Sequence, residues 1–176
     1  LDVPNGVILY GPPGTGKTMF AKACAKECNC SFINLCQSSF ENQYFGESLK
    51  LLKACFSIAH KIRPVIIFID EMDGFLSRRS DMDQSHVNSL KTEFLSLMDG
   101  LVTKRSNVFV IGATNRLEFI DEAIKRRMSA QIKVDKPTKI EILDICNKLL
   151  KEENMSENFD FDILIESLCE KQFTGS

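Results

Sequence analysis

Short apolar runs alternate with longer segments of helical periodicity along most of this chain. Runs rich in β-branched or aromatic residues predict strands at Val7–Tyr10, Ser31–Leu35, Val65–Ile69 and Val108–Ala113, and Ile132–Val134 predicts a fifth. The third run is apolar at every position, which is typical of a parallel strand that is buried on both faces. The pattern therefore predicts a central strand in a covered sheet.

Apolar residues at spacings of three and four predict helices between these strands. They cover Lys17–Cys28, Glu47–Ile62, Val87–Leu101, Phe119–Met128 and Thr138–Glu153, with a further short helix at Asp162–Cys169. Pro64 ends the second helical pattern, because proline has no N–H to donate. The polar segments 38–46 and 78–85 show no periodicity and predict loops.

Strands that alternate with helices predict an α/β fold, in which helices cover both faces of a parallel sheet. The composition changes near Pro137, and only helices are predicted after it. We therefore expect a larger domain over residues 1–136. Residues 137–176 would begin a smaller, all-helical domain that is cut off before it is complete.

The composition indicates a globular chain and limits the classes of partner that it would bind. Of 176 residues, 44% are hydrophobic and 26% are charged, with a net charge of −2. This chain is too apolar and too nearly neutral to be disordered, and it has no electrostatic reason to bind nucleic acid. It shows neither a secretory leader nor an apolar run near the roughly 20 residues of a membrane span, so a membrane anchor would lie outside this segment.

Seven cysteines, an odd number, favour free thiols in a reducing compartment. Four of them cluster, at Cys24, Cys28, Cys30 and Cys36. Structural zinc sites usually pair two separated Cys-x-x-Cys motifs, and no histidine lies near this cluster. The favoured interpretation is small hydrophobic side chains, and a metal site is the alternative.

The segment Gly11–Thr18 carries the first chemical signal. It matches the pattern G-x-x-x-x-G-K-[ST] and lies between a predicted strand and a predicted helix. Its glycines let consecutive N–H groups point at a phosphate, and the following helix adds a partial positive charge. Lys17 would reach the β- and γ-phosphates of ATP, and the Thr18 hydroxyl would bind Mg²⁺. The candidate nucleotide-binding residues are Gly11, Pro12, Pro13, Gly14, Thr15, Gly16, Lys17, Thr18 and Met19. A glycine-rich turn with a chance Lys-Thr pair is the alternative.

Asp70 and Glu71 follow the apolar strand Val65–Ile69 directly. Two carboxylates at the end of a buried strand are costly unless they have a function, and ligands of open α/β sheets bind at that edge. Asp70 would hold Mg²⁺, and Glu71 would orient and activate the attacking water as a general base. A solvated acidic turn is the alternative.

Asn115 follows the next predicted strand, within the sequence Gly-Ala-Thr-Asn-Arg. Its side-chain amide would lie at the same edge of the sheet and help to place the water. An ordinary asparagine-containing turn is the alternative interpretation.

In this order and spacing, Gly11–Thr18, Ile66–Glu71 and Gly112–Asn115 resemble the large subdomain of an AAA ATPase, and residues 120–128 resemble that family's second region of homology. The resemblance covers essentially the whole chain. It is greatest to the meiotic clade, and within it to the ATPases that extract misplaced tail-anchored proteins from the mitochondrial outer membrane. It implies a P-loop NTPase with a five-stranded parallel sheet, residues 1–136 as the large nucleotide-binding subdomain and residues 137–176 as the start of the helical small subdomain.

The resemblance also implies a Mg²⁺-dependent ATPase that works as a homo-hexamer, threads polypeptides through its pore, and faces the cytosol at the mitochondrial outer membrane. Arg126 and Arg127 match the arginine fingers, which reach the γ-phosphate bound by the neighbouring subunit. Tyr44, Phe45 and Gly46 match the aromatic loop of the pore, and residues 78–86 match a second pore loop. From the residues alone, a basic helix end and a pair of core aromatics are the alternatives.

Several positions depart from the family's pattern. Gln43 replaces the usual Lys before the pore aromatics, Leu117 replaces a Pro, and Gln172 replaces a Gly before Phe173. The first departure weakens any basic contribution to substrate attraction.

Two other functions are consistent with part of this pattern. Microtubule severing, as in katanin- or spastin-like members, would favour basic pore loops, which Gln43, Asp81 and Asp83 disfavour. A scaffold that binds ATP without hydrolysing it is the second, and intact Lys17, Asp70, Glu71 and Asn115 disfavour it.

Overall fold

The computed structural model describes residues 4–36, 46–76, 84–103 and 107–150. The chain divides into two compact units. The larger unit comprises Leu1–Gly11 and Lys17–Lys133, and the smaller comprises Pro12–Gly16 and Val134–Ser176.

The larger unit is built on a parallel sheet. Its strands are β1 (Gly6–Tyr10), β2 (Ser31–Leu35), β3 (Val65–Ile69), β4 (Val108–Thr114) and β5 (Ala130–Lys133). They lie in the order β2-β3-β4-β1-β5, and every pair is parallel. The predicted five-stranded parallel sheet is confirmed.

The order of the strands locates the place where a ligand would bind. The chain leaves β1 toward the β2 edge and leaves β4 toward the β5 edge, although β1 and β4 are neighbours. Such a reversal opens a crevice at the carboxyl ends of the strands. The register pairs Tyr10 with Thr114 and Ile69 with Gly112, so the residues that follow β1, β3 and β4 emerge at one edge.

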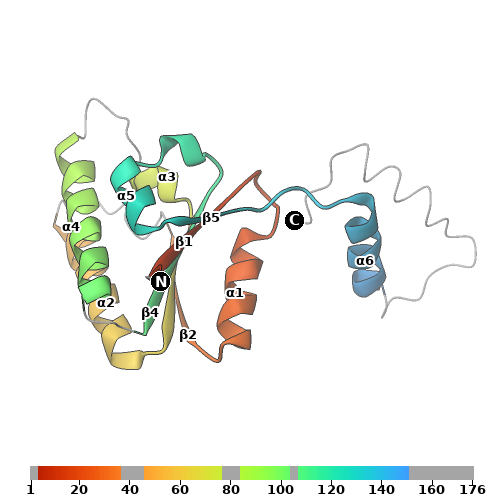
Figure 1. Ribbon diagram of the computed structural model, residues 1–176, viewed down its shortest axis with the longest axis horizontal. Helices are drawn as coiled ribbons and strands as arrows, with labels where there is room; N and C mark the ends of the chain where they lie inside the picture. Colours follow the sequence, from red (N-terminus) through yellow and green to blue (C-terminus); the bar gives the residue numbers. More distant parts are fainter. Residues whose placement is uncertain (1–3, 37–45, 77–83, 104–106, 151–176) are drawn as a thin grey trace, which may run out of the picture. The chain divides into compact units, whose positions relative to one another are not determined.

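Helices cover both faces of the sheet, as predicted (Figure 1). On one face lies α1 (Lys17–Glu27), which contacts β2, β3 and β4. The other face carries α2 (Glu47–Ile62), α3 (Met72–Leu76), α4 (Gln84–Thr103) and α5 (Glu122–Arg127), after a 3-10 turn, η2 (Leu117–Phe119). Right-handed crossovers between parallel strands require this division of the helices.

All five residues of β3 are buried, which confirms the prediction of a central strand. Ile67 and Ile69 pack with Phe94 of α4 in the main core cluster. Because side chains alternate along a strand, Phe68 faces the other way, where its ring stacks on Phe32 at 5.8 Å between centroids.

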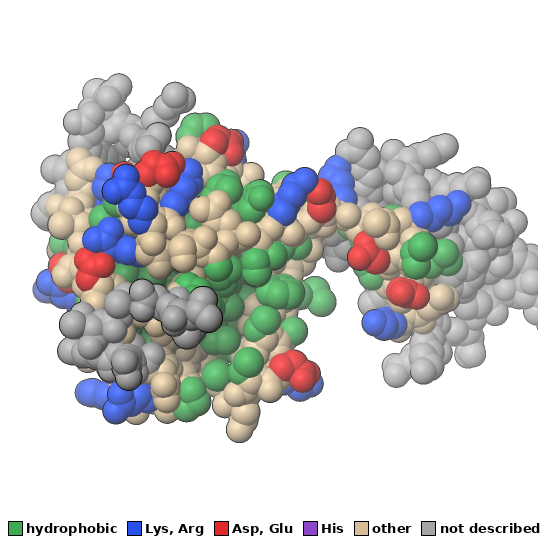
Figure 2. Space-filling model, in the orientation of Figure 1, with side chains coloured by type: hydrophobic (Ala, Val, Ile, Leu, Met, Phe, Trp, Pro, Cys, Tyr) green, Lys and Arg blue, Asp and Glu red, His purple; other side chains and the backbone are tan. Residues whose placement is uncertain are grey.

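Helix α1 buries Ala21 and Ala25, whose small side chains allow the helix to lie close to the sheet. Phe20 of the same helix is 44% exposed. Figure 2 shows charged side chains concentrated over α4 and α5, whereas apolar side chains dominate the surface near the sheet and α1.

The structure corrects several predicted boundaries. Helix α3 is not anticipated by the periodicity, because five residues that include Gly74 are too short and too poor in helix formers to produce a signal. The predicted helix 119–128 is divided into η2 and α5 by Asp121, whose side chain caps α5 by accepting from the Ala123 N–H at 2.8 Å. Strand β5 begins at Ala130 rather than Ile132, and α4 begins at Gln84 inside the predicted loop.

In the smaller unit, α6 (Lys139–Leu150) begins with a capping box. The backbone N–H and hydroxyl of Thr138 both donate to the Glu141 carboxylate, at 2.7 and 2.8 Å. Ile142 and Cys146 of this helix are buried. The helix predicted at Asp162–Cys169 lies outside the described residues. No helix within the described ranges is long and apolar enough to cross a membrane.

Candidate nucleotide-binding site

The segment between β1 and α1 has the backbone of a phosphate-binding loop. Gly14 and Gly16 have positive φ angles of 75° and 86°, which L side chains rarely adopt. The Thr15 hydroxyl donates to the Pro12 carbonyl at 3.0 Å. Helix α1 begins at Lys17, immediately after this loop, and the N-terminus of a helix favours binding of an anion.

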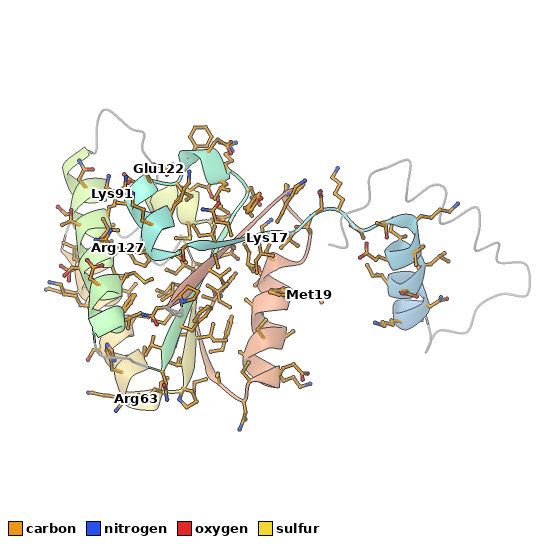
Figure 3. All side chains as sticks on the ribbon, in the orientation of Figure 1. Lys17, Met19, Arg63, Lys91, Glu122 and Arg127 are labelled. Atoms are coloured by element: carbon orange, nitrogen blue, oxygen red, sulfur yellow. The ribbon has the colours of Figure 1, made fainter. Side chains whose placement is uncertain are left out.

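Lys17 lies at the start of α1 with its side chain almost fully buried, only 8% exposed (Figure 3). Its ammonium donates to the Gly11 carbonyl at 2.9 Å. Burial lowers the pKa of Lys17 below its usual value, while the charges of Asp70 and Asp73 oppose this effect. A phosphate oxygen could accept a charge-assisted hydrogen bond from this ammonium, which would offset the cost of its partial desolvation.

Thr18 and Asp70, separated by 52 positions in the sequence, contact each other directly. The Thr18 hydroxyl donates to Asp70 Oδ2 at 3.1 Å. The other carboxylate oxygen, Oδ1, accepts from the Glu71 N–H at 3.0 Å. A hydroxyl beside a carboxylate supplies the hard oxygen ligands that Mg²⁺ prefers, so these two residues fit that ion.

Glu71 has a positive φ angle of 51°, which is uncommon outside glycine. The Asp70 N–H donates to the Leu35 carbonyl at 2.9 Å, and the Gly74 N–H donates to the Glu71 carbonyl at 2.8 Å. The turn therefore holds Glu71 exposed between β3 and α3. Non-glycine residues with such backbone angles are concentrated at functional sites.

Asn115 is exposed just beyond the end of β4. The Gly11 N–H donates to the carbonyl of the preceding residue, Thr114, at 3.3 Å. Asn115 therefore emerges at the edge that also carries Lys17 and Asp70. Five predicted residues of the larger unit follow the carboxyl ends of β1, β3 and β4, namely Lys17, Thr18, Asp70, Glu71 and Asn115.

Sequence reasoning missed two residues at this edge. Thr114 is 1% exposed, and its hydroxyl donates to Asp73 Oδ1 at 2.7 Å. The available signals were Asp73, a third acidic residue two positions after Glu71, and Thr114, the residue before Asn115. Only the folded chain shows that their side chains meet.

The two arginines of α5 have different surroundings. Arg127 donates from Nε and Nη2 to both carboxylate oxygens of Asp99 on α4, at 2.7 and 2.8 Å, and from Nη1 to the Ala123 carbonyl at 3.1 Å. Arg126 is exposed. The labelled Lys91 and Arg127 lie where α4 and α5 face each other (Figure 3), and Lys91 pairs with Asp121 at 2.9 Å.

The structure adds little about the roles of the remaining predicted residues. Tyr44, Phe45 and most of the second pore loop lie outside the described residues, and Gly46 precedes α2. Met19 is 73% exposed and points away from the sheet (Figure 3). The cysteines that the structure describes are free thiols, and no cluster of three or more His, Cys, Asp or Glu side chains in that part of the chain could hold a metal.

Comparisons with known proteins agree with this geometry. Residues 7–136 match the family described as "ATPase family associated with various cellular activities (AAA)". The chain is 48% identical over 178 residues to the outer mitochondrial transmembrane helix translocase of Homo sapiens, covering 100% of this chain and 48% of that protein. It is 44% identical over 156 residues to the mitochondrial sorting homolog of Caenorhabditis elegans, covering 89% of this chain and 46% of that protein.

Among solved structures, the crystal structure of the FIGL-1 AAA domain in complex with ADP superposes with a TM-score of 0.76 at 36% identity, covering 95% of this chain and 54% of that chain. Fold and site thus define a P-loop nucleoside triphosphatase. More narrowly, the chain belongs to the AAA family and is an ATPase domain that binds nucleotide.

The expected similarity to the mitochondrial outer-membrane extractases is confirmed by the translocase relatives. The chain spans about half the length of the curated relatives it matches.

Proposed function

We propose that this chain is the motor domain of a Mg²⁺-dependent ATPase that pulls protein substrates out of a membrane. The observation that carries the proposal is the contact between Thr18 and Asp70, whose carboxylate also acts on the charge of Lys17. It brings the start of α1 and the acidic end of β3 together, as hydrolysis of a phosphoanhydride requires.

Each residue of the site has a proposed role. Gly11–Thr18 and Met19 bind the nucleotide, with Lys17 on the β- and γ-phosphates. Glu71 accepts a proton from the attacking water, and Asn115 orients that water from the neighbouring strand end. Thr18 and Asp70 hold Mg²⁺, which when bound neutralises charge that develops on the phosphate oxygens.

The larger machine extends beyond this chain. We propose a homo-hexamer in which Arg126 and Arg127 act on the nucleotide of the neighbouring subunit. Tyr44, Phe45 and Gly46 would line its pore and grip an extended polypeptide. In this proposal residues 1–136 are the large nucleotide-binding subdomain and residues 137–176 belong to the helical small subdomain. The similarity to translocases supports a location of the protein at the mitochondrial outer membrane. We propose that it faces the cytosol there and acts on tail-anchored proteins.

The test uses the full-length protein and its Glu71→Gln variant. The variant keeps the size and hydrogen bonding of Glu71 but removes the base, so phosphate release should fall by roughly 10²- to 10⁴-fold while ATP still binds. Glu27→Gln, an exposed change at the far end of α1, is the control and should hydrolyse ATP normally. Turnover of Glu71→Gln at the wild-type rate would remove Glu71 from the mechanism.

The substrate is tested separately. Wild type should extract a tail-anchored test protein from liposomes in an ATP-dependent manner, and Glu71→Gln should not. Tubulin in place of the liposomes should neither raise ATP turnover nor be severed. Severing without extraction would contradict the proposed substrate and leave the ATPase assignment intact.

A further inference from the structure

Two turns carry the proposed water-handling residues, and the sheet alone does not hold them together. Glu71 follows β3 and Asn115 follows β4, but the ladder between these strands ends where Ile69 pairs with Gly112. Beyond that pair, the distance between the two turns depends on side-chain contacts. A general base and a water-orienting amide must keep a fixed separation to act on one water molecule.

One contact bridges the two turns. The Thr114 hydroxyl donates to Asp73 Oδ1 at 2.7 Å. The Thr114 hydroxyl oxygen also accepts from the Arg116 N–H at 3.0 Å. Both bonds of this hydroxyl lie at a position that is 1% exposed, and the first is a charge-assisted bond. The hydroxyl therefore closes the backbone turn around Asn115 and joins it to the start of α3.

A second contact runs beside the first. Met72 is fully buried, and a Cβ added at Gly112 would collide with its sulfur and lie 3.0 Å from its Cε. The residues immediately after Glu71 are thus attached to β4 twice, by Met72 packing on Gly112 and by Asp73 bonding to Thr114. Glu71, with its positive φ, has its following residues fixed to the strand that leads to Asn115.

We infer that Asp73 and Thr114 are positioning residues for ATP hydrolysis, whose hydrogen bond sets the placement of Glu71 relative to Asn115. This inference rests on the proposed roles of Glu71 and Asn115. Neither Asp73 nor Thr114 needs to touch the nucleotide. Loss of their bond should slow the chemical step and leave the phosphate-binding loop intact, because Lys17 and Thr18 are held by other contacts.

The test compares three variants of the full-length protein. Thr114→Val is nearly isosteric and removes the hydroxyl, Asp73→Ala removes the acceptor, and Thr114→Ser keeps the hydroxyl. The first two should lower kcat about tenfold or more. The dissociation constant of ATP should stay within about threefold of wild type for Thr114→Val. Asp73→Ala also removes a negative charge that acts on Lys17, so its ATP binding should not weaken. Thr114→Ser should keep kcat within about threefold of wild type, which is a rescue that depends on the hydroxyl alone.

A bond that only stabilises the fold would lower the melting temperature without separating kcat from ATP affinity. The inference is therefore overturned if Thr114→Val turns over normally, if Thr114→Ser is as slow as Thr114→Val, or if ATP affinity falls as much as kcat. Should Thr114→Val fail to fold, Asp73→Ala decides, because Asp73 is partly exposed. ATP turnover of Glu71→Gln is measured in parallel. If Glu71→Gln hydrolyses ATP at the wild-type rate, the proposed function itself fails. If Glu71→Gln is slow but Thr114→Val hydrolyses ATP normally, only this inference is overturned.

Discussion

Arg127 of α5 and Asp99 of α4 form a bidentate ion pair, with Nε–Oδ1 and Nη2–Oδ2 distances of 2.7 and 2.8 Å. A guanidinium that acts on a neighbouring subunit must present its donors outward, but three of the Arg127 donors are occupied within its own chain. Arg126, one position earlier, is exposed. The sequence gives no reason to distinguish the two arginines, but the structure shows that Arg127 is paired within its own chain and Arg126 is exposed.

The Asp99–Arg127 pair should stabilise the fold modestly. We expect Asp99→Asn to lower the free energy of unfolding by about 0.2–1 kcal/mol, because the Asp99 side chain is 56% exposed and water screens the pair. Arg126→Ala should change it less. The hydrogen bond from Arg127 lowers the pKa of Asp99, so this contribution is complete above the usual Asp value of 3.8 and is lost as the pH falls through the lowered pKa. Thermal melts at pH 7 and in acid measure the difference, and equal melting of wild type and Asp99→Asn at pH 7 would contradict it.

Mixed rings test whether the arginines act across subunits. Full-length Arg126→Ala/Arg127→Ala subunits and Glu71→Gln subunits should each be inactive alone. When they are mixed, an intact Glu71 site can face an intact arginine pair, so some ATP turnover should return. Absence of recovery in rings shown by mass measurement to be mixed would count against the trans role. In the single variants, Arg126→Ala should lower turnover more than Arg127→Ala, because Arg127 must first leave Asp99.

Gly112 should not tolerate a side chain. Gly112→Ala places a methyl group against Met72, so we expect a loss of about 1–3 kcal/mol in the free energy of unfolding from overpacking. ATP turnover should fall as well, since Met72 follows Glu71 directly. In Gly112→Ala/Met72→Ala the collision is relieved, so the double variant should be more stable than the sum of the two single losses predicts. Chemical denaturation of all four proteins measures this coupling, and simple additivity would show that the two residues do not compete for space.

ATP binding should be linked to protonation of Lys17. Burial lowers the pKa of the free Lys17 ammonium from 10.5, and a bound phosphate raises it again by stabilising the charge. At about pH 10 the free site is partly deprotonated, so binding should take up protons and affinity should fall as the pH rises. Calorimetric titrations in two buffers of different ionisation enthalpy measure the uptake. Lys17→Arg, which stays charged over this range, should show none, and equal uptake by both proteins would exclude Lys17 as its source.

Tyr44 should matter for work on a substrate and much less for ATP turnover. We expect full-length Tyr44→Ala to hydrolyse ATP within about tenfold of wild type, a loss below about 1.4 kcal/mol at the active site, yet fail to extract a tail-anchored protein from liposomes. Tyr44→Phe keeps an aromatic ring for the polypeptide and should extract it. If Tyr44→Ala is unfolded in a thermal melt, the ring belongs to the core; if it is folded and extracts normally, it does not grip the substrate.

Local features of the chain were predictable from local residues. The strands Ser31–Leu35 and Val65–Ile69 and the helix Glu47–Ile62 are predicted with the bounds that the structure has. Val65–Ile69 is apolar throughout, Glu47–Ile62 is strongly periodic, and Ser31–Leu35 is a short run centred on Phe32 and Ile33. The candidate chemistry of Gly11–Thr18 and Asp70-Glu71 was also readable, since each motif is contiguous and follows a strand. Weak patterns failed: α3 has too few residues to show a period, and Asp121 divides one predicted helix by capping it.

Neighbours along the chain were enough to specify most of the alternating strands and helices, and they fix the residue types that end each strand. The tertiary structure alone decided the strand order β2-β3-β4-β1-β5 and the pairs Thr18–Asp70, Asp73–Thr114 and Asp99–Arg127. Their members lie 52, 41 and 28 positions apart, so no local pattern specifies them. They exist because burial of both sheet faces aligns the strand ends and sets α5 against α4, and side chains that meet there must satisfy their charges and hydrogen bonds with one another.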